Sequence, residues 1–236
     1  MYNWQKVSVV FPAYNECENI FDAIKDFKST GYVDEIIVVD NNSKDNTAEL
    51  AKKAWATVIT EKNQWYGWAN RRWLKEASWD IIVTCEPDWT FVAKDILKLL
   101  IYSEDFDAVF WTRTSKECIW DWAKMNRSLR LGNVIVAKWL EWLFNGPCLT
   151  DVWCSFKLIK KDSLKKIENK FTVWWSHFSP EFMLLIIKNG IKCVEIPVNY
   201  KKRIWESKIT SDNRKAFKLG CRMAWMILAY RIWLKK

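Results

Sequence analysis

The hydrophobic pattern of the chain alternates short apolar runs with segments of helical spacing. Residues 7–11 (V-S-V-V-F) form a run that suits a strand buried on both faces. Apolar side chains recur at helical spacing within residues 17–29, and residues 35–39 form a second buried strand. Further strands are predicted at residues 57–60, 80–85, 108–110 and 192–200. Further helices are predicted at residues 47–54, 68–78, 95–103, 124–144 and 178–188. The helix at residues 124–144 is expected to be interrupted at Gly132-Asn133. This alternation predicts an α/β domain with a mostly parallel central sheet.

Polar segments follow the first two strands at the point where each strand ends. Pro12 ends the first strand and leads into the loop Ala13-Tyr14-Asn15-Glu16, whereas the second strand ends at Asp40. Two adjacent parallel strands that end in such loops form a crevice, which is where open α/β sheets bind ligands. Asp40 is expected to accept hydrogen bonds from a base or ribose. Asn42 and Asp45 are expected to cap the following helix.

Two carboxylates one residue apart follow the strand predicted at residues 80–85. They belong to Glu86 and Asp88, on a bend fixed by Pro87. Such a pair can point at one hard divalent cation, because these cations prefer oxygen ligands. The sequence therefore predicts a site for Mg²⁺ or Mn²⁺ on this loop.

These segments resemble the nucleotide-sugar-binding half of family 2 glycosyltransferases, which have the GT-A fold. The similar segments are F-P-A-Y-N-E, V-V-D-N-N-S-K-D-N-T and the Glu86-Pro87-Asp88 bend, which resembles the D-x-D element of the family. Residues 149–157 (L-T-D-V-W-C-S-F-K) and 203–208 (R-I-W-E-S-K) resemble segments of dolichyl-phosphate mannose synthase-like enzymes. The resemblance implies a three-layer α/β/α GT-A domain over residues 1–208. A basic amphipathic helix is predicted at residues 209–236.

The resemblance also implies an inverting glycosyltransferase and assigns roles to particular residues. The nucleotide sugar would be bound by Pro12, Ala13, Tyr14, Glu16, Asp40, Asn42 and Arg113. The cation would be ligated directly by Asp88, with Glu86 acting through water. Bound there, it would bridge the diphosphate and stabilise the leaving group.

The sequence does not decide between two classes of sugar acceptor. A polyprenyl phosphate is already an anion, so Arg113, Arg203, Ser207 and Lys208 would orient it without a general base. A sugar hydroxyl, as in polysaccharide or cell-envelope synthesis, would need Asp151 or Glu181 to take its proton. Two other classes are a GT-A-like binding protein without turnover and a nucleotidyltransferase, the latter disfavoured by the lack of a Gly-rich opening loop.

Charge and hydropathy suit work close to a membrane surface. Lys and Arg number 37 against 28 Asp and Glu, a net charge of +9, which favours anionic partners such as nucleotide diphosphates and lipid phosphates. Nucleic acid is not predicted as a partner. The N-terminus shows no signal peptide, and no apolar run reaches the ~18 residues of a membrane span. The seven cysteines form no C-x-x-C pair, which favours reduced thiols. A cytoplasmic location is predicted, with peripheral contact at the inner face of the membrane.

Tryptophan is abundant where glycine is expected. The chain has 18 Trp and 6 Gly, whereas roughly 16 or 17 Gly are usual for this length. In the resembling family, glycine is usual at Trp55, Trp65, Trp68, Trp73, Trp79, Trp89, Trp111, Trp122, Trp153 and Trp205. Our hypothesis is that these positions are UGA codons, which the source bacterium decodes as glycine. The alternative is a Trp-rich protein that stacks on sugars, in which the indoles would block the donor crevice.

Overall fold

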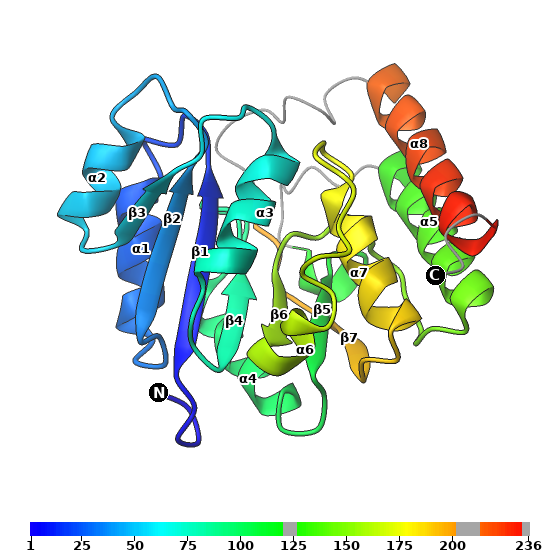
Figure 1. Ribbon diagram of the computed structural model, residues 1–236, viewed down its shortest axis with the longest axis horizontal. Coiled ribbons are helices and arrows are strands. Elements are labelled where there is room, and N and C mark those ends of the chain that lie inside the picture. Colours follow the sequence, from blue (N-terminus) through cyan, green and yellow to red (C-terminus); the bar gives the residue numbers. More distant parts are fainter. Residues whose placement is uncertain (120–126, 202–212, 233–236) are drawn as a thin grey trace.

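The computed structural model describes residues 1–119, 127–201 and 213–232, and its centre is a seven-stranded sheet (Figure 1). The strand order is β3-β2-β1-β4-β6-β5-β7. The strands are β1 (Val7–Ala13), β2 (Glu35–Asp40), β3 (Thr57–Thr60), β4 (Ile81–Thr84), β5 (Ala108–Thr112), β6 (Lys157–Lys160) and β7 (Cys193–Pro197). All neighbours are parallel except β6, which runs antiparallel to both β4 and β5.

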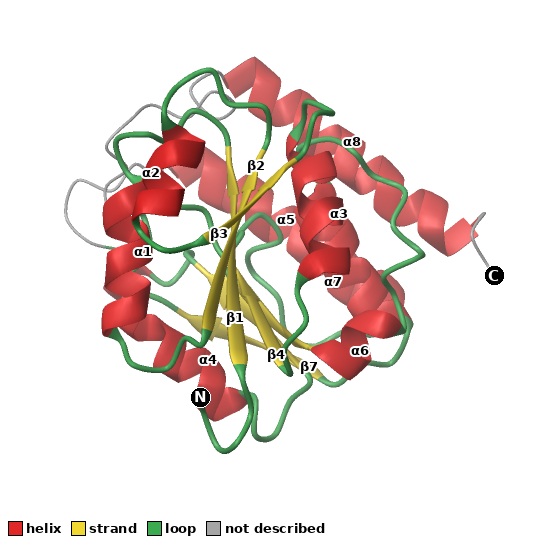
Figure 2. Ribbon diagram, turned by 60° about the vertical axis from the view of Figure 1, so that its left-hand side comes forward, coloured by secondary structure: helices red, strands yellow, loops and turns green. Residues whose placement is uncertain are grey.

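Helices cover both faces of the sheet (Figure 2). One side carries α1 (Ile20–Ser29), α2 (Thr47–Lys53) and α4 (Ile96–Tyr102). The other side carries α3 (Tyr66–Glu76), α5 (Arg127–Phe144), α6 (Lys161–Lys165), α7 (Phe178–Lys188) and α8 (Asn213–Ile232). Short 3₁₀ turns lie at Ala93–Asp95 and Lys116–Cys118. Each face has its own apolar core, so the predicted three-layer α/β/α fold is confirmed.

Two local predictions were wrong, and one strand and one helix were missed. Pro12 lies inside β1, in register with Val39, and does not stop the strand. The helix α5 runs through Gly132-Asn133 without an interruption. The strand β6 and the helix α6 were not predicted, because K-L-I-K is a very short apolar pattern bracketed by lysines.

The helix α8 packs against the domain along one side. Leu219, Met223 and Ile227 are buried in the core shared with α5 and α7. The opposite side leaves Phe217 and Trp225 exposed to solvent. In the part of the chain that the structure describes, no helix combines the length and the hydropathy needed to cross a membrane.

Three tryptophans at expected glycine positions have a left-handed backbone. The φ angles are 64° at Trp55, 123° at Trp65 and 62° at Trp89, a region that glycine adopts readily and other residues rarely. Trp79, another of the expected glycine positions, does not have this conformation, and Lys6 Nζ lies 3.8 Å from its ring centroid. The backbone therefore favours glycine at three of these positions.

Two further tryptophans of the set are fully buried. Trp73 donates a hydrogen bond from Nε1 to Asn70 Oδ1 at 3.0 Å, so the core accommodates it. Trp111 has no partner for Nε1 among the described residues, and its ring centroid lies only 3.5 Å from that of Phe156. Trp111 is thus both crowded and unsatisfied. Trp122 and Trp205 lie outside the described residues.

Candidate active site at the carboxyl edge of the sheet

A cavity of about 1230 Å³, here called the edge pocket, opens where β1, β2 and β4 end. It is lined by the end of β1 and the loop after it (residues 12–19), Asn41, Asp45, Gln64, Trp65, Tyr66, Ala69, the Glu86-Pro87-Asp88 bend, Trp175, Ser176, Lys218, Leu219 and Arg222. The carboxyl ends of parallel strands are the usual ligand-binding edge of an open α/β sheet. The edge pocket is therefore the candidate active site.

Four of the predicted nucleotide-binding residues line the edge pocket. They are Pro12, Ala13, Tyr14 and Glu16. Their loop is fixed to the segment that follows β2, because the Glu16 N–H donates to Thr47 Oγ1 at 2.8 Å. The sequence pattern at the end of β1 thus identified one wall of the pocket.

The predicted residues at the end of β2 do not line the edge pocket. Asp40 is buried and accepts a hydrogen bond from the Ser43 N–H at 3.3 Å, and Asn42 is exposed with a φ of 60°. Asn41, between them, lines the pocket instead. The strand ends at Asp40 and the backbone turns at Asn42, so the alternation of a strand did not predict which of these side chains faces the pocket.

Asn41 fixes the loop that leads into α3. Its Oδ1 accepts a hydrogen bond from the Trp65 N–H at 3.0 Å, and its Nδ2 donates to the Asn63 carbonyl at 2.6 Å. At the start of α3, a Cβ on Gly67 would overlap the backbone of Trp174, so only glycine permits this approach.

The predicted cap of α2 is formed only in part. Asp45 Oδ1 accepts a hydrogen bond at 3.0 Å from the N–H of Thr47, the first helical residue. Asn42 makes no such contact among the described residues; the N-cap position belongs to Asn46, whose side chain does not cap the helix. Asp45 therefore orders the segment, and its other oxygen accepts from the Cys17 N–H at 3.2 Å.

The two carboxylates after β4 line the same pocket. Asp88 is 5% exposed and accepts hydrogen bonds from Thr90, at 3.2 Å from N and 2.5 Å from Oγ1. Tyr66 lines the wall near Glu86, and burial together with that carboxylate raises the pKa of its phenol well above the usual value. No cluster of three or more metal-ligating side chains exists within the described residues. A pair of carboxylates suits Mg²⁺ or Mn²⁺, which take oxygen ligands and are commonly completed by water and phosphate.

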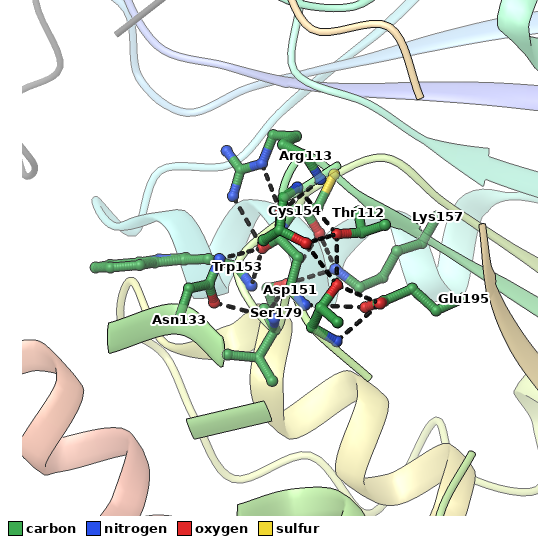
Figure 3. Close-up of polar contacts among 12 residues, drawn as sticks. Thr112, Arg113, Asn133, Asp151, Trp153, Cys154, Lys157, Ser179 and Glu195 are labelled. Atoms are coloured by element: carbon green, nitrogen blue, oxygen red, sulfur yellow. Dashed lines mark hydrogen bonds and ion pairs between the residues drawn. The ribbon is translucent and has the colours of Figure 1, made fainter. Parts of the chain in front are cut away.

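Arg113, also predicted to bind the nucleotide sugar, does not line the edge pocket. It pairs with Asp151 instead (Figure 3). Arg113 donates to the Asp151 carboxylate from Nε at 2.8 Å, from Nη2 at 3.1 Å and from its backbone N–H at 3.0 Å. Asn133 Nδ2 and the N–H groups of Trp153 and Cys154 donate to the same carboxylate. Burial opposes its charge, yet the guanidinium and these donors lower the pKa of Asp151 to about 2. A carboxylate so fully engaged is a poor proton acceptor, so the geometry favours a positioning role.

Glu181 is engaged in a similar way. It is buried and accepts hydrogen bonds from the backbone N–H groups of Thr172 (2.8 Å) and Val173 (3.0 Å). The Tyr230 hydroxyl of α8 also donates to it at 2.5 Å. Glu181 thus ties α8 and the segment before α7 together, and it does not line the edge pocket.

Glu195 of β7 is expected to make stability depend on pH. Burial raises the pKa of its carboxyl from 4.5 to about 7, although Thr150 and the Asp151 N–H donate hydrogen bonds to it. A raised folded-state pKa means that its stabilising contribution is present below the unfolded value and is lost as pH rises through the folded value. The free energy of unfolding should therefore fall by up to about 3 kcal/mol between pH 4.5 and 7 through this group.

Urea denaturation at several pH values, on wild type and Glu195→Gln, measures that contribution. The variant should lack this part of the pH dependence, whereas Glu49→Gln on the exposed side of α2 should behave like wild type. If the unfolding free energies of wild type and Glu195→Gln change with pH by the same amount, the raised pKa of Glu195 is contradicted.

The remaining predicted acceptor residues, Arg203, Ser207 and Lys208, lie outside the described residues. Their roles stay predictions from the sequence. All seven cysteines are described and are free thiols, with Cys85 and Cys154 buried.

Comparison with known proteins identifies the family of the chain. Residues 8–168 match the family model described as glycosyl transferase family 2. A dolichyl-phosphate hexose transferase of Haloferax volcanii is 27% identical over 212 residues, covering 88% of each chain. The glycosyltransferase AglJ of the same organism is 27% identical over 199 residues, which are 84% of this chain and 63% of AglJ.

Solved structures share the fold. Glucosyl-3-phosphoglycerate synthase from Mycobacterium tuberculosis, in complex with Mn²⁺, UDP and glucosyl-3-phosphoglycerate, superposes with a TM-score of 0.71. The alignment covers 97% of this chain and 80% of the synthase at 18% identity, so it bears on the fold alone. The family match, in contrast, spans more than half of the chain. The chain therefore belongs to glycosyl transferase family 2 and is a glycosyltransferase.

Proposed function

We propose that this glycosyltransferase moves a sugar, with inversion, from a nucleotide-diphosphate sugar to a polyprenyl phosphate. The observation that carries the proposal is the edge pocket, whose wall combines the loop after β1 with Glu86 and Asp88 after β4. The similarity to a dolichyl-phosphate hexose transferase supports a lipid phosphate as the acceptor class. The net charge of +9 supports it too, because both substrates are anions.

The proposed reaction is a single displacement at the anomeric carbon. An oxygen of the acceptor phosphate forms the new bond to that carbon, and the bond from the carbon to the diphosphate breaks, so the nucleoside diphosphate leaves. In this pocket Tyr14 and Glu16 would position the nucleotide. Mg²⁺ or Mn²⁺, held by Asp88 and Glu86, would neutralise the diphosphate charge. Structures of the mycobacterial synthase that contain UDP with Mn²⁺ or Mg²⁺ support this choice of cation.

The alternative acceptor is a sugar hydroxyl, which requires a general base. Asp151 and Glu181 were the candidates, and both are buried acceptors of several hydrogen bonds outside the pocket wall. The lowered pKa of Asp151 also disfavours proton uptake near neutral pH. These features support the phosphate acceptor, which needs no base.

Four variants separate the two acceptors. Lys208→Ala and Arg203→Ala should each weaken use of a polyprenyl phosphate about tenfold or more, because charge-assisted hydrogen bonds contribute roughly 1.5–3 kcal/mol each. Asp151→Asn and Glu181→Gln should retain transfer per folded molecule. The measurement is sugar transfer to a polyprenyl phosphate, with nucleotide-sugar affinity as the control. The lipid-phosphate acceptor would be rejected if Lys208→Ala and Arg203→Ala kept the wild-type transfer rate. The two carboxylate variants would in that case have to be folded but inactive.

We also propose peripheral contact with the cytoplasmic face of a membrane. The exposed side of α8 carries Phe217 and Trp225 together with Lys218 and Arg222, a mixture that suits the boundary between headgroups and acyl chains. A lipid-linked acceptor would be reached from such a surface.

We infer, finally, that the natural protein has glycine at the ten tryptophan positions that the family resemblance identified. The left-handed φ of Trp55, Trp65 and Trp89 and the crowding of Trp111 support this proposal. Trp65 also lines the edge pocket, where an indole would occupy room that a donor needs.

The coding DNA tests this inference directly. UGA codons are expected at Trp65, Trp79, Trp89, Trp111 and Trp153, and UGG at Trp120, where the family tolerates an aromatic residue. Mass spectrometry of the protein from its natural host should then show glycine at each UGA. UGG codons throughout would contradict the inference and favour a sugar-stacking binding protein without turnover.

A further inference from the structure

Two basic side chains of α8, Lys218 and Arg222, line the edge pocket. They are four residues apart, so they lie on the same side of the helix. Leu219, which is 5% exposed, packs into the core beside them and holds this part of α8 against the domain. Neither Lys218 nor Arg222 makes an ion pair with another described residue. The pocket wall thus includes two cations that no carboxylate of the described chain neutralises.

The other charged residues of this wall are all acidic, as far as the structure describes it. They are Glu16, Glu18, Asp45, Glu86 and Asp88. Among the described residues of the wall, the positive charge lies on Lys218 and Arg222, so these two side chains attract an anionic group that enters the pocket. Lys218 and Arg222 therefore mark the place on the wall that suits a phosphate.

The size of the edge pocket leaves room for more than the donor. Its volume of about 1230 Å³ exceeds the ~300–1,000 Å³ usual for a single small ligand. The donor diphosphate would lie at Glu86 and Asp88, where a bound divalent cation would balance its charge. A second phosphate in the same pocket needs its own positive charge.

We propose that Lys218 and Arg222 bind the phosphate group of the acceptor. This inference rests on the proposed transfer to a polyprenyl phosphate and adds to it a binding site on α8. Arg222 can donate two parallel hydrogen bonds to phosphate oxygens, and Lys218 adds a mobile point charge. The same chemistry would also recognise the donor diphosphate, so the experiment must separate the two phosphates.

The test uses the full-length chain as wild type, Lys218→Gln, Arg222→Gln and the double variant. Arg231→Gln is the matched control, because Arg231 is exposed on the same helix and does not line the pocket. One arm measures the KM for a short-chain polyprenyl phosphate in neutral detergent micelles, which exclude attraction to anionic lipid. The other arm measures the Kd of UDP and of GDP with MnCl₂ by calorimetry.

The double variant should raise the KM for the polyprenyl phosphate at least tenfold, with kcat changed little at saturation. The Kd of the nucleoside diphosphate should change less than twofold, and Arg231→Gln should match wild type. An unchanged KM for the polyprenyl phosphate overturns the assignment of Lys218 and Arg222 to the acceptor. This holds whether or not the nucleoside diphosphate binds more weakly. If wild type itself transfers no sugar to the polyprenyl phosphate, the proposed function fails first, and this inference fails with it.

Discussion

Asp88→Asn is expected to lower the rate of sugar transfer about a hundredfold or more while the fold stays intact. The substitution removes one of the two carboxylates that line the edge pocket after β4, and with it half of the local charge available to a divalent cation. Loss of a preorganised electrostatic contact at a developing charge typically costs about 10²–10³ in rate. Asn retains an acceptor for the Thr90 hydrogen bonds, so the loop should keep its shape. Initial transfer rates with MnCl₂ and the melting temperature measure both expectations.

Glu18→Gln is the matched control for Asp88→Asn. Glu18 lines the same pocket but belongs to the loop after β1 and not to the bend after β4. Its variant should stay within a few-fold of the wild-type rate. The metal-assisted mechanism would be ruled out if Asp88→Asn transferred sugar at the wild-type rate. It would also be ruled out if the wild-type rate persisted after a chelator had removed the cation.

Asp151→Asn is expected to cost about 3–5 kcal/mol of unfolding free energy, the usual range when one partner of a buried ion pair is removed. The carboxylate is itself fully buried and accepts hydrogen bonds from Arg113, Asn133 and the backbone N–H groups of Trp153 and Cys154. An amide in its place leaves the Arg113 guanidinium uncompensated and turns an NH₂ group toward donors. Urea denaturation gives the free energy directly.

Asp162→Asn is the control, because Asp162 is exposed and pairs with Lys165 at the surface. It should change the unfolding free energy by no more than about 0.5 kcal/mol. A stable but inactive Asp151→Asn would contradict the positioning role and restore Asp151 as a general base.

The sequence predicted those parts of the site that follow directly from buried strands. Apolar runs such as residues 7–11 and 35–39 have no stable alternative to a central position in a sheet. The polar residues that come next must then lie at one edge. This reasoning predicts that Tyr14, Glu16 and Asp88 lie at the same edge, and all three line the edge pocket.

Other features depend on tertiary contacts that carry no local signal. The antiparallel strand β6 is specified by its neighbours β4 and β5, because four residues are too few to show a period. The engagement of Arg113 by Asp151 joins residues 38 apart in the chain. The contribution of α8 to the edge pocket arises likewise from packing between distant segments.

The most direct test of the proposed function is sugar transfer itself. Full-length protein that carries the residues its natural host inserts is incubated with radiolabelled UDP- and GDP-sugars and a polyprenyl phosphate, with MnCl₂ or with EDTA. We predict that one nucleotide sugar labels the lipid, that EDTA abolishes the labelling, and that the corresponding uncharged polyprenol is not labelled. Labelling that is equal in EDTA, or labelling of a sugar hydroxyl acceptor but not of the polyprenyl phosphate, would contradict the proposed function.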